Sequence, residues 1–241
     1  MREQRRLALP AATAFDPAEI AGLPEPVRRY FTAAIAPGTP ASRSVELRMR
    51  GSIRIGRWMP FRADEILTPL RGFVWRARAA GIISGSDRFV DDKGVMRWKL
   101  AGVVPVMSAE GPDISRSAAG RAGGEGLWLP TALLPRFGVA WDATDDGHIT
   151  ARFRVGETAI ELRHTIDDAG RVTASVLDRW GDPDSAGTFA SHPFGGDVTG
   201  YGSFGGITIP TSGRLGWGYG TDSWPDGEFF RYQLTDVEPV G

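Results

Sequence analysis

An arginine and a glutamate four residues apart are the side chains in this sequence whose types and spacing most directly suggest chemistry. Arg121 and Glu125 would lie on one face of a helix, and Trp128 follows within the next turn. Such a pair either forms an ion pair on a helix surface beside a core tryptophan, or lies at the rim of a cavity and orients the polar head group of a ligand. The sequence leaves both interpretations open.

The three histidines form no metal-binding motif. His148, His164 and His192 lie far apart, without the spacing of a zinc site, which needs three protein ligands at a catalytic centre. We therefore expect no metal and no cofactor. His192, in a predicted loop near Asp197, could serve as a general base, as could His164. An enzyme of unknown reaction that uses a histidine and a carboxylate in a cleft is thus the alternative function, with its catalytic residues unknown.

The remaining motifs favour structure over catalysis. Residues 200–205 match the G-x-G-x-x-G pattern, but the residues after them, 207–210, are typical of a strand, and a dinucleotide site needs a helix there. The adjacent aspartates at 91–92, 145–146 and 167–168 fall in predicted turns, where they usually accept backbone hydrogen bonds. No nucleophile motif of the G-x-S-x-G or S-x-x-K type occurs.

Composition excludes several classes of protein. The chain has 241 residues and no cysteine, which excludes disulfide scaffolds, thiolate metal sites and thiol catalysis. The 28 Lys and Arg balance 29 Asp and Glu, so we expect no nucleic-acid partner. No apolar run is long enough to span a bilayer, and residues 1–12 lack the apolar core of a signal peptide. We expect a cytoplasmic protein, whose oligomeric state the sequence does not indicate.

Most of the chain alternates apolar and polar residues with a period of two, which is typical of strands with one buried face. Short turn sequences separate the strands, so neighbours should pair antiparallel. We predict a mainly β protein with a single large curled antiparallel sheet, a half-barrel or a barrel. A short N-terminal helix and a helical insertion should accompany it. The expected units are an N-terminal helical segment over residues 1–40 and a β domain over 41–241, with the insertion at 112–135.

The eight tryptophans are spread over separate predicted strands and turns. They either fill the core of the curled sheet or line an apolar cavity that the sheet encloses. We predict binding of a hydrophobic or amphipathic, lipid-like small molecule in such a cavity. The expected ligand-binding residues are the four tryptophans and the charged pair: Trp75, Trp98, Trp128, Trp141, Arg121 and Glu125.

Four stretches of the sequence carry a family resemblance: residues 23–30, 72–78, 94–98 and 121–134, of which the Trp-Leu-Pro segment at 128–130 is the most specific. Over roughly residues 20–238 the chain resembles a family of uncharacterised bacterial proteins classed as a domain of unknown function. Its general plan also looks like the LolA-type lipoprotein-carrier half-barrel. That likeness implies a sheet wrapped around an apolar cavity, with residues 113–134 as a lid and the strand aromatics as the cavity wall.

Overall fold

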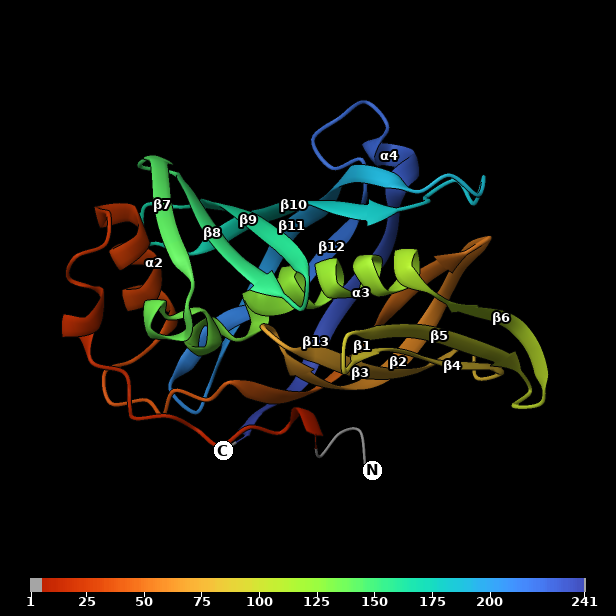
Figure 1. Ribbon diagram of the computed structural model, residues 1–241, viewed down its shortest axis with the longest axis horizontal. Coiled ribbons are helices and arrows are strands. Elements are labelled where there is room, and N and C mark those ends of the chain that lie inside the picture. Colours follow the sequence, from red (N-terminus) through yellow and green to blue (C-terminus); the bar gives the residue numbers. More distant parts are fainter. Residues whose placement is uncertain (1–5, 241) are drawn as a thin grey trace.

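The computed structural model describes residues 6–240, in which all thirteen strands belong to one antiparallel sheet (Figure 1). The strand order is β6-β5-β4-β3-β2-β1-β13-β12-β11-β10-β9-β8-β7. In this part of the chain β6 and β7 are the two edges, so the sheet is open. The predicted mainly β fold with a single curled antiparallel sheet is confirmed, in its half-barrel form.

The strands have the following bounds: β1 Ser44–Ile55, β2 Arg57–Thr68, β3 Gly72–Ala79, β4 Ile83–Val90, β5 Lys93–Leu100, β6 Val104–Glu110, β7 Ala140–Asp145, β8 His148–Val155, β9 Thr158–Ile166, β10 Val172–Gly181, β11 Ala190–Phe204, β12 Ile207–Trp217 and β13 Glu228–Val240.

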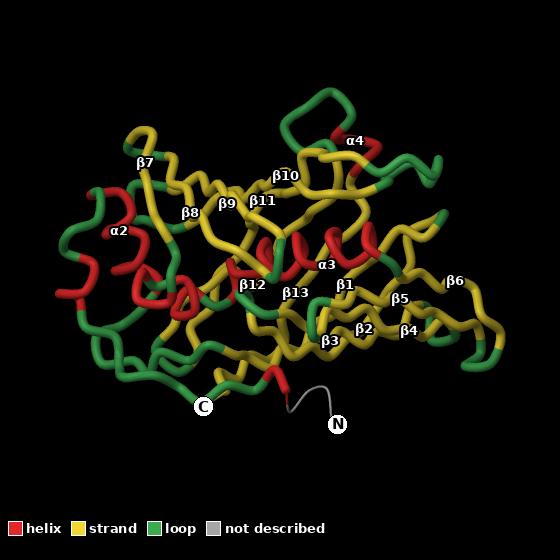
Figure 2. Tube along the Cα trace, viewed as in Figure 1, coloured by secondary structure: helices red, strands yellow, loops and turns green. Residues whose placement is uncertain are grey.

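The sheet consists of two wings that meet at its centre. Strands β1 to β6 form one meander and β7 to β12 another, and β13 pairs with both β1 and β12 (Figure 2). Side chains alternate along the strands and so define the concave face. In β1, Val45, Leu47 and Met49 are buried, while Glu46 and Arg48 between them are exposed. The apolar sides of the two wings therefore face one another across a concave interior.

The N-terminal segment contains a 3-10 turn, η1 Pro17–Ile20, followed by the helix α2 Glu25–Ala34. Val27, Tyr30, Phe31 and Ala34 recur at helical spacing and are buried, as expected for one apolar face packed on the sheet. The helix ends where Ile35 becomes extended and forms a bridge with Ile207. Residues 1–5 of the predicted 1–40 segment lie outside the described residues.

The insertion between β6 and β7 is helical. It comprises α3 Pro112–Gly124 and the 3-10 turns η2 Glu125–Trp128, η3 Pro130–Leu133 and η4 Pro135–Phe137. Another short helix, α4 Trp224–Gly227, precedes β13. Helix α3 runs along the concave side of the sheet, between the two wings (Figure 1). The insertion thus occupies the interior of the half-barrel and contacts both wings.

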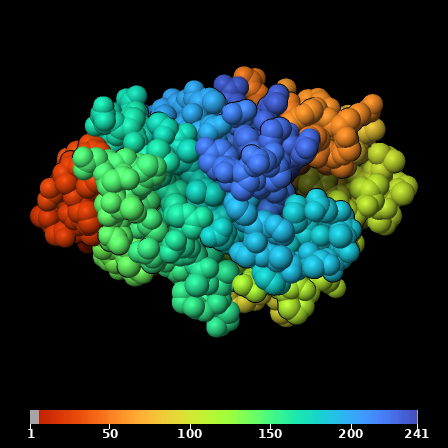
Figure 3. Space-filling model, turned by 90° about the horizontal axis from the view of Figure 1, so that it is seen from above, coloured from red at the N-terminus to blue at the C-terminus, as the bar shows by residue number. Residues whose placement is uncertain are grey.

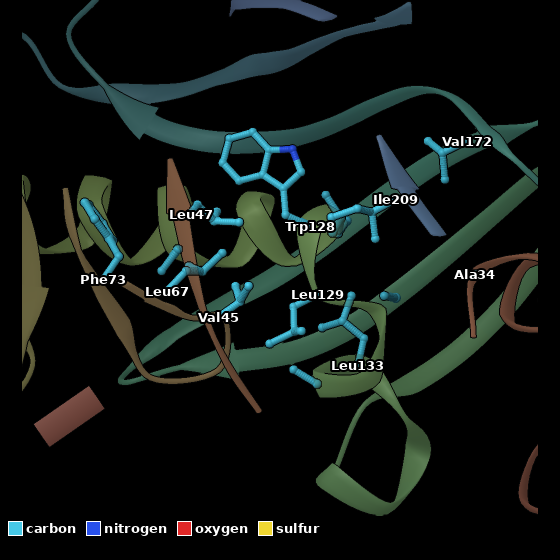
Figure 4. Close-up of a cluster of buried hydrophobic side chains, with 14 of the residues drawn as sticks. Ala34, Val45, Leu47, Leu67, Phe73, Trp128, Leu129, Leu133, Val172 and Ile209 are labelled. Carbon is cyan, nitrogen blue, oxygen red and sulfur yellow. The ribbon is translucent and has the colours of Figure 1, made fainter. Parts of the chain in front are cut away.

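The end of the insertion also supplies part of the core. Trp128, Leu129 and Leu133 are almost completely buried, and their side chains lie among those of Val45 and Leu47 (Figure 4). Seen from above, the molecule is elongated, with the N-terminal segment at one end and strands β5 and β6 at the other (Figure 3). No helix within residues 6–240 is long and apolar enough to cross a membrane.

The structure has more strands than the sequence pattern revealed. Strand β4 carries Gly85 and Asp87 at inward positions where the pattern requires large apolar residues, and the indole of Trp98 fills the space over Gly85. In β11, residues 200–204 of the G-x-G-x-x-G match are strand and are followed by a turn at Gly205 and Gly206 and then by β12. The match therefore has no helix after it, which agrees with the structural interpretation.

Candidate functional site

A cavity of about 540 Å³ lies between α3 and the concave face of the sheet. Most of its wall is apolar, and the side chains come from both wings and from the central strands. The cavity reaches solvent near Met107 on β6 and near Ser185 and Gly187 in the β10–β11 loop, all of which are exposed. A volume above about 300 Å³ is typical of small-molecule sites. The principal apolar lining residues are Met49, Ile53, Met96, Met107, Leu177, Phe189, Phe194, Leu215, Trp217, Phe229 and Phe230.

Helix α3 is held close to β5 by a glycine. A Cβ atom on Gly94 would lie 2.6 Å from the carbonyl oxygen of Ile114 and 2.7 Å from the Cα of Ser115, so any larger residue would push the helix away. The amide of Gly94 donates to Oγ of Ser115 at 2.9 Å, and this hydroxyl donates to the carbonyl of Gly111 at 2.8 Å. The β1–β6 wing thereby fixes the first turn of the helix.

The other wing holds the opposite side of the helix. Trp180 on β10 donates from Nε1 to Oδ1 of Asp113 at 2.8 Å, and the guanidinium of Arg116 lies 3.9 Å from the centre of its ring. Gly123 lets the end of α3 approach Ile160 on β9, whose Cγ1 would lie 2.9 Å from an added Cβ. Contacts to both wings fix how far apart the cavity walls stand.

Arg121 on α3 is at the centre of a buried cluster of charged side chains. Its Nε donates to Oε1 of Glu125 at 2.7 Å, its Nη1 to Oδ2 of Asp87 at 3.1 Å, and its Nη2 lies 3.5 Å from Oε1 of Glu65. The guanidinium also lies 4.9 Å from the centre of the Trp75 ring. The Glu65 side chain is completely buried, and those of Asp87 and Glu125 are 15% and 13% exposed. One cation therefore compensates three carboxyl groups away from water.

Burial shifts the pKa of two of these carboxyl groups. Burial, and next the charge of Glu125, raise the pKa of Glu65 well above its usual value, although Arg121 acts in the opposite direction. Burial also raises the pKa of Asp87. Oε2 of Glu65 and Oε2 of Glu125 are both buried and have no hydrogen-bond partner. Burial beside Glu125 therefore favours the protonated form of Glu65 relative to a glutamate in water.

A second buried arginine, Arg179 on β10, lines the cavity without an ion pair in residues 6–240. Its Nε donates to the carbonyl of Ser117 at 3.1 Å and its Nη2 to Oγ of Ser117 at 3.3 Å. The guanidinium lies 4.6 Å from the centre of the Phe194 ring and 5.0 Å from that of Trp217. Burial, and next the charge of Arg121, lower the pKa of Arg179 to about 10, so it is still a cation at neutral pH.

Four of the six predicted ligand-binding residues line the cavity: Trp75, Arg121, Glu125 and Trp128. Trp98 is displaced from the cavity surface; its ring packs 5.7 Å from that of Trp75 and its Nε1 donates to Asp87 at 3.0 Å. Trp141 lies elsewhere, among the aromatic rings of Tyr30 and Phe31, and donates to the carbonyl of Leu133. The structure thus places Trp98 behind the site and Trp141 outside it.

The sequence interpretation missed Glu65, Asp87 and Arg179, and it also missed Asp182 and Arg214, two charged residues that line the cavity. Glu65 had a detectable pattern, since it continues the inward register of Met59, Phe61 and Ala63 along β2, where a carboxylate is unexpected. Asp87 and Arg179 lie in strands whose sequences gave no clear alternation at those positions.

No histidine is among the residues that line the cavity in the described chain. His164 is completely buried between Tyr30 and Trp141, with no hydrogen-bond partner on either ring nitrogen, and burial lowers its pKa to about 4. His148 is exposed and contacts Asp145, and His192 lies with its ring edge-on to Trp217. No group of three His, Cys, Asp or Glu side chains within residues 6–240 could hold a metal ion.

Comparison with known proteins gives a family but no activity. No curated protein matches the sequence. The backbone is similar to that of a putative outer membrane lipoprotein-sorting protein domain from Vibrio parahaemolyticus, with a TM-score of 0.41, 8% identity and coverage of 89% of this chain and 90% of the other. It is also similar to a LolA superfamily protein from Nitrosomonas europaea, with a TM-score of 0.42, 10% identity and coverage of 83% and 86%. A model of a family of unknown function, DUF6544, matches residues 13–229, and the chain belongs to this family.

Proposed function

We propose that this protein binds a hydrophobic or amphipathic, lipid-like small molecule in the cavity between α3 and the sheet. The observation that supports the proposal is the cavity itself, with its volume of about 540 Å³, its largely apolar wall and its few converging charged groups. Sites for small molecules have this composition, because apolar walls supply affinity and a few polar groups fix orientation. Desolvation of the apolar wall by a ligand would supply most of the binding free energy.

The apolar part of the ligand would lie against Trp75, Trp128 and the aromatic residues of β11 to β13. Its polar head group would meet the charged residues beside α3. The donors of Arg121 are already directed at three carboxyl groups, whereas Arg179 donates only to Ser117 among the described residues. Arg179 therefore retains a donor for an acidic head group, and an arginine among aromatic rings is a strong anchor for a carboxylate.

Native mass spectrometry of protein purified gently from its own host tests the proposal. We expect an adduct with the mass of a lipid, released by organic extraction. The same preparation, after extraction, should bind a fluorescent long-chain carboxylate probe. Protein that carries no adduct and binds no probe would contradict the proposal.

Cavity-filling variants give the matched control. Ala109→Trp places an indole in the cavity from β6, while Ser108→Trp places the same indole on the exposed, opposite face of the same strand. We expect Ala109→Trp to weaken probe binding at least tenfold and Ser108→Trp to leave it unchanged. Equal affinity of the two variants would place the probe outside the cavity.

A further inference from the structure

The large exposed apolar side chains of the described chain all gather at one end of the β1–β6 wing. In an antiparallel meander every second turn lies at the same end, so the β1–β2, β3–β4 and β5–β6 turns are neighbours. Hydrogen bonds join them: the amide of Ala80 donates to Pro60, and that of Ala101 donates to Ile82, both at 2.8 Å. The exposed apolar residues at this end are Ile55, Trp58, Ile82, Leu100, Val103, Val104, Val106 and Met107.

We call the six of these residues on the β3–β4 turn and the β5–β6 hairpin the apolar tip. It comprises Ile82, Leu100, Val103, Val104, Val106 and Met107, and Val103 is the most exposed at 73%. Surface apolar residues are usually scattered singly, whereas a contiguous group marks an interaction site. The tip belongs to edge strand β6 and its neighbours, and Met107 also lines the cavity mouth.

A row of cations lies behind the apolar tip on the outer face of the sheet. Arg62 is opposite Arg78, Arg78 is opposite Ser84, and Ser84 is opposite Lys99, so the three cations follow one line across β2 to β5. Each is exposed and has no carboxylate partner within residues 6–240. Residues 50–62, 76–86 and 95–109, which form this end of the wing, contain no aspartate or glutamate. The acidic residues that border this end are Asp64, Asp87 and Glu110, of which Glu110 lies 3.7 Å from Arg97.

We infer that this end of the molecule docks on the surface of an anionic lipid membrane. Apolar tip residues would insert below the head groups, and Arg62, Arg78 and Lys99 would meet the anionic lipids. Trp58, 37% exposed at the β1–β2 turn, is of the residue type enriched at membrane interfaces. A second copy of this chain fits the apolar tip less well than a membrane does. A symmetric contact through β6 would bring the cations of the two copies, Arg62, Arg78 and Lys99 of each, toward one another. Docking here would present the cavity mouth to the lipid, but the inference does not depend on what the cavity holds.

Flotation of the full chain with lipid vesicles tests the inference. We expect binding to phosphatidylcholine vesicles that contain one third phosphatidylglycerol, weak binding to phosphatidylcholine alone, and loss of binding at high salt. Lipids brominated near the head group should quench Trp58, so the quenching should fall in Trp58→Phe. Absence of binding to the anionic vesicles would overturn the inference whether or not the cavity binds a probe.

Two pairs of substitutions separate the apolar and the cationic contributions. Val103→Ser with Val104→Ser removes apolar area without changing charge, and Arg78→Ser with Lys99→Ser removes two cations. Each double variant should bind the anionic vesicles at least tenfold more weakly. The control Arg71→Ser, in the exposed β2–β3 turn at the opposite end of β3, should bind as the unmodified protein does. Equal losses in the control and the double variants would overturn the inference.

The exposed positions of these substitutions leave the core intact, and thermal unfolding checks this for each variant. Light scattering over a range of protein concentrations tests whether a second copy of the chain, instead of a membrane, covers the apolar tip. A dimer that the Val103→Ser and Val104→Ser substitutions abolish would assign the apolar tip to contact between copies and would overturn membrane docking. A monomer that binds vesicles in the expected order supports it.

Discussion

The guanidinium of Arg121 on α3 lies 3.5 Å from the carboxyl of Glu65 on β2, and the Glu65 side chain is completely inaccessible to solvent. The contact joins α3 to the interior of the β1–β6 wing. Because Glu125 and Asp87 approach the same guanidinium, the arginine holds together one helix and two strands. Its removal would leave buried carboxyl groups without a cation.

We expect Arg121→Met to lower the free energy of unfolding by about 3 kcal/mol, since loss of one partner leaves uncompensated buried charges. Denaturation in urea measures this difference. The control is Arg152→Met, because Arg152 pairs with Glu161 on the surface, where their side chains are 51% and 46% exposed. That variant should lose less than about 1 kcal/mol. Similar losses in the two variants would contradict the role assigned to the buried cluster.

The raised pKa of Glu65 predicts a dependence of stability on pH. The folded protein keeps a proton on Glu65 that the unfolded chain releases above pH 4.5, so this group lowers stability as pH rises from there toward its folded pKa. Glu65→Gln resembles the protonated form of the side chain, so its stability does not fall with rising pH through this group. Its free energy of unfolding, relative to the unmodified protein, should therefore increase with pH by up to roughly 1 kcal/mol per pH unit.

Glu161→Gln should show the opposite slope. Hydrogen bonds from Arg152, and next from Arg163, lower the pKa of the exposed Glu161, so its stabilising contribution is present above pH 4.5 and is lost as pH falls through the lowered pKa. Urea denaturation at a series of pH values compares the two variants. A Glu65→Gln difference that does not change with pH would show that Glu65 is ionised in the folded protein.

The approach of α3 to β5 depends on Gly94. Gly94→Ala should lower the free energy of unfolding by about 1–3 kcal/mol, because the new methyl group would meet backbone atoms of Ile114 and Ser115, which cannot move aside as a flexible side chain does. Thermal unfolding measures the loss. Gly22→Ala is the control, since nothing lies within 4 Å of the added Cβ there. An unchanged stability of Gly94→Ala would mean that the helix shifts freely.

The assignment of Arg179 as an anchor predicts a change in ligand selectivity. Arg179→Met should weaken binding of a long-chain carboxylate by ten- to a hundredfold, the range for a charge-assisted hydrogen bond, and leave binding of the corresponding alcohol nearly unchanged. Isothermal titration calorimetry with the two ligands measures both affinities. A parallel loss for the alcohol would show that the side chain acts through packing against Phe194 and Trp217.

The sequence predicted those elements in which buried positions carry apolar residues and exposed positions carry polar ones. Strand β1 alternates buried apolar residues with exposed arginines, and α2 repeats its buried residues at helical spacing, so both elements were recognised. Strand β2 was not, because its inward positions include Ala63 and the buried Glu65, and Pro60 interrupts the pattern. At such inward positions, side chains from other parts of the chain fill the space or compensate the charge. The local sequence of the strand does not show these partners.

The same reason limits prediction of the site. The spacing of Arg121 and Glu125 within one helix brought this pair to attention, and the structure confirms their ion pair. Glu65 and Asp87 reach the same arginine from strands 56 and 34 residues away, and Arg179 faces the cavity from the other wing. Their convergence depends on the curvature of the whole sheet. The buried cluster is therefore a property of the tertiary structure.

The pairing of β1 with β13 has a consequence for the folding of the protein. Each wing is a meander of neighbours in the chain, with short-range contacts that can form early, but β12 joins β1 only through β13, the last of the thirteen strands in chain order. Until β13 has paired with both, the two walls of the cavity are not linked through the sheet, and a partly folded chain exposes their apolar surfaces. The apolar interior is therefore assembled late in folding, when β13 pairs with β1.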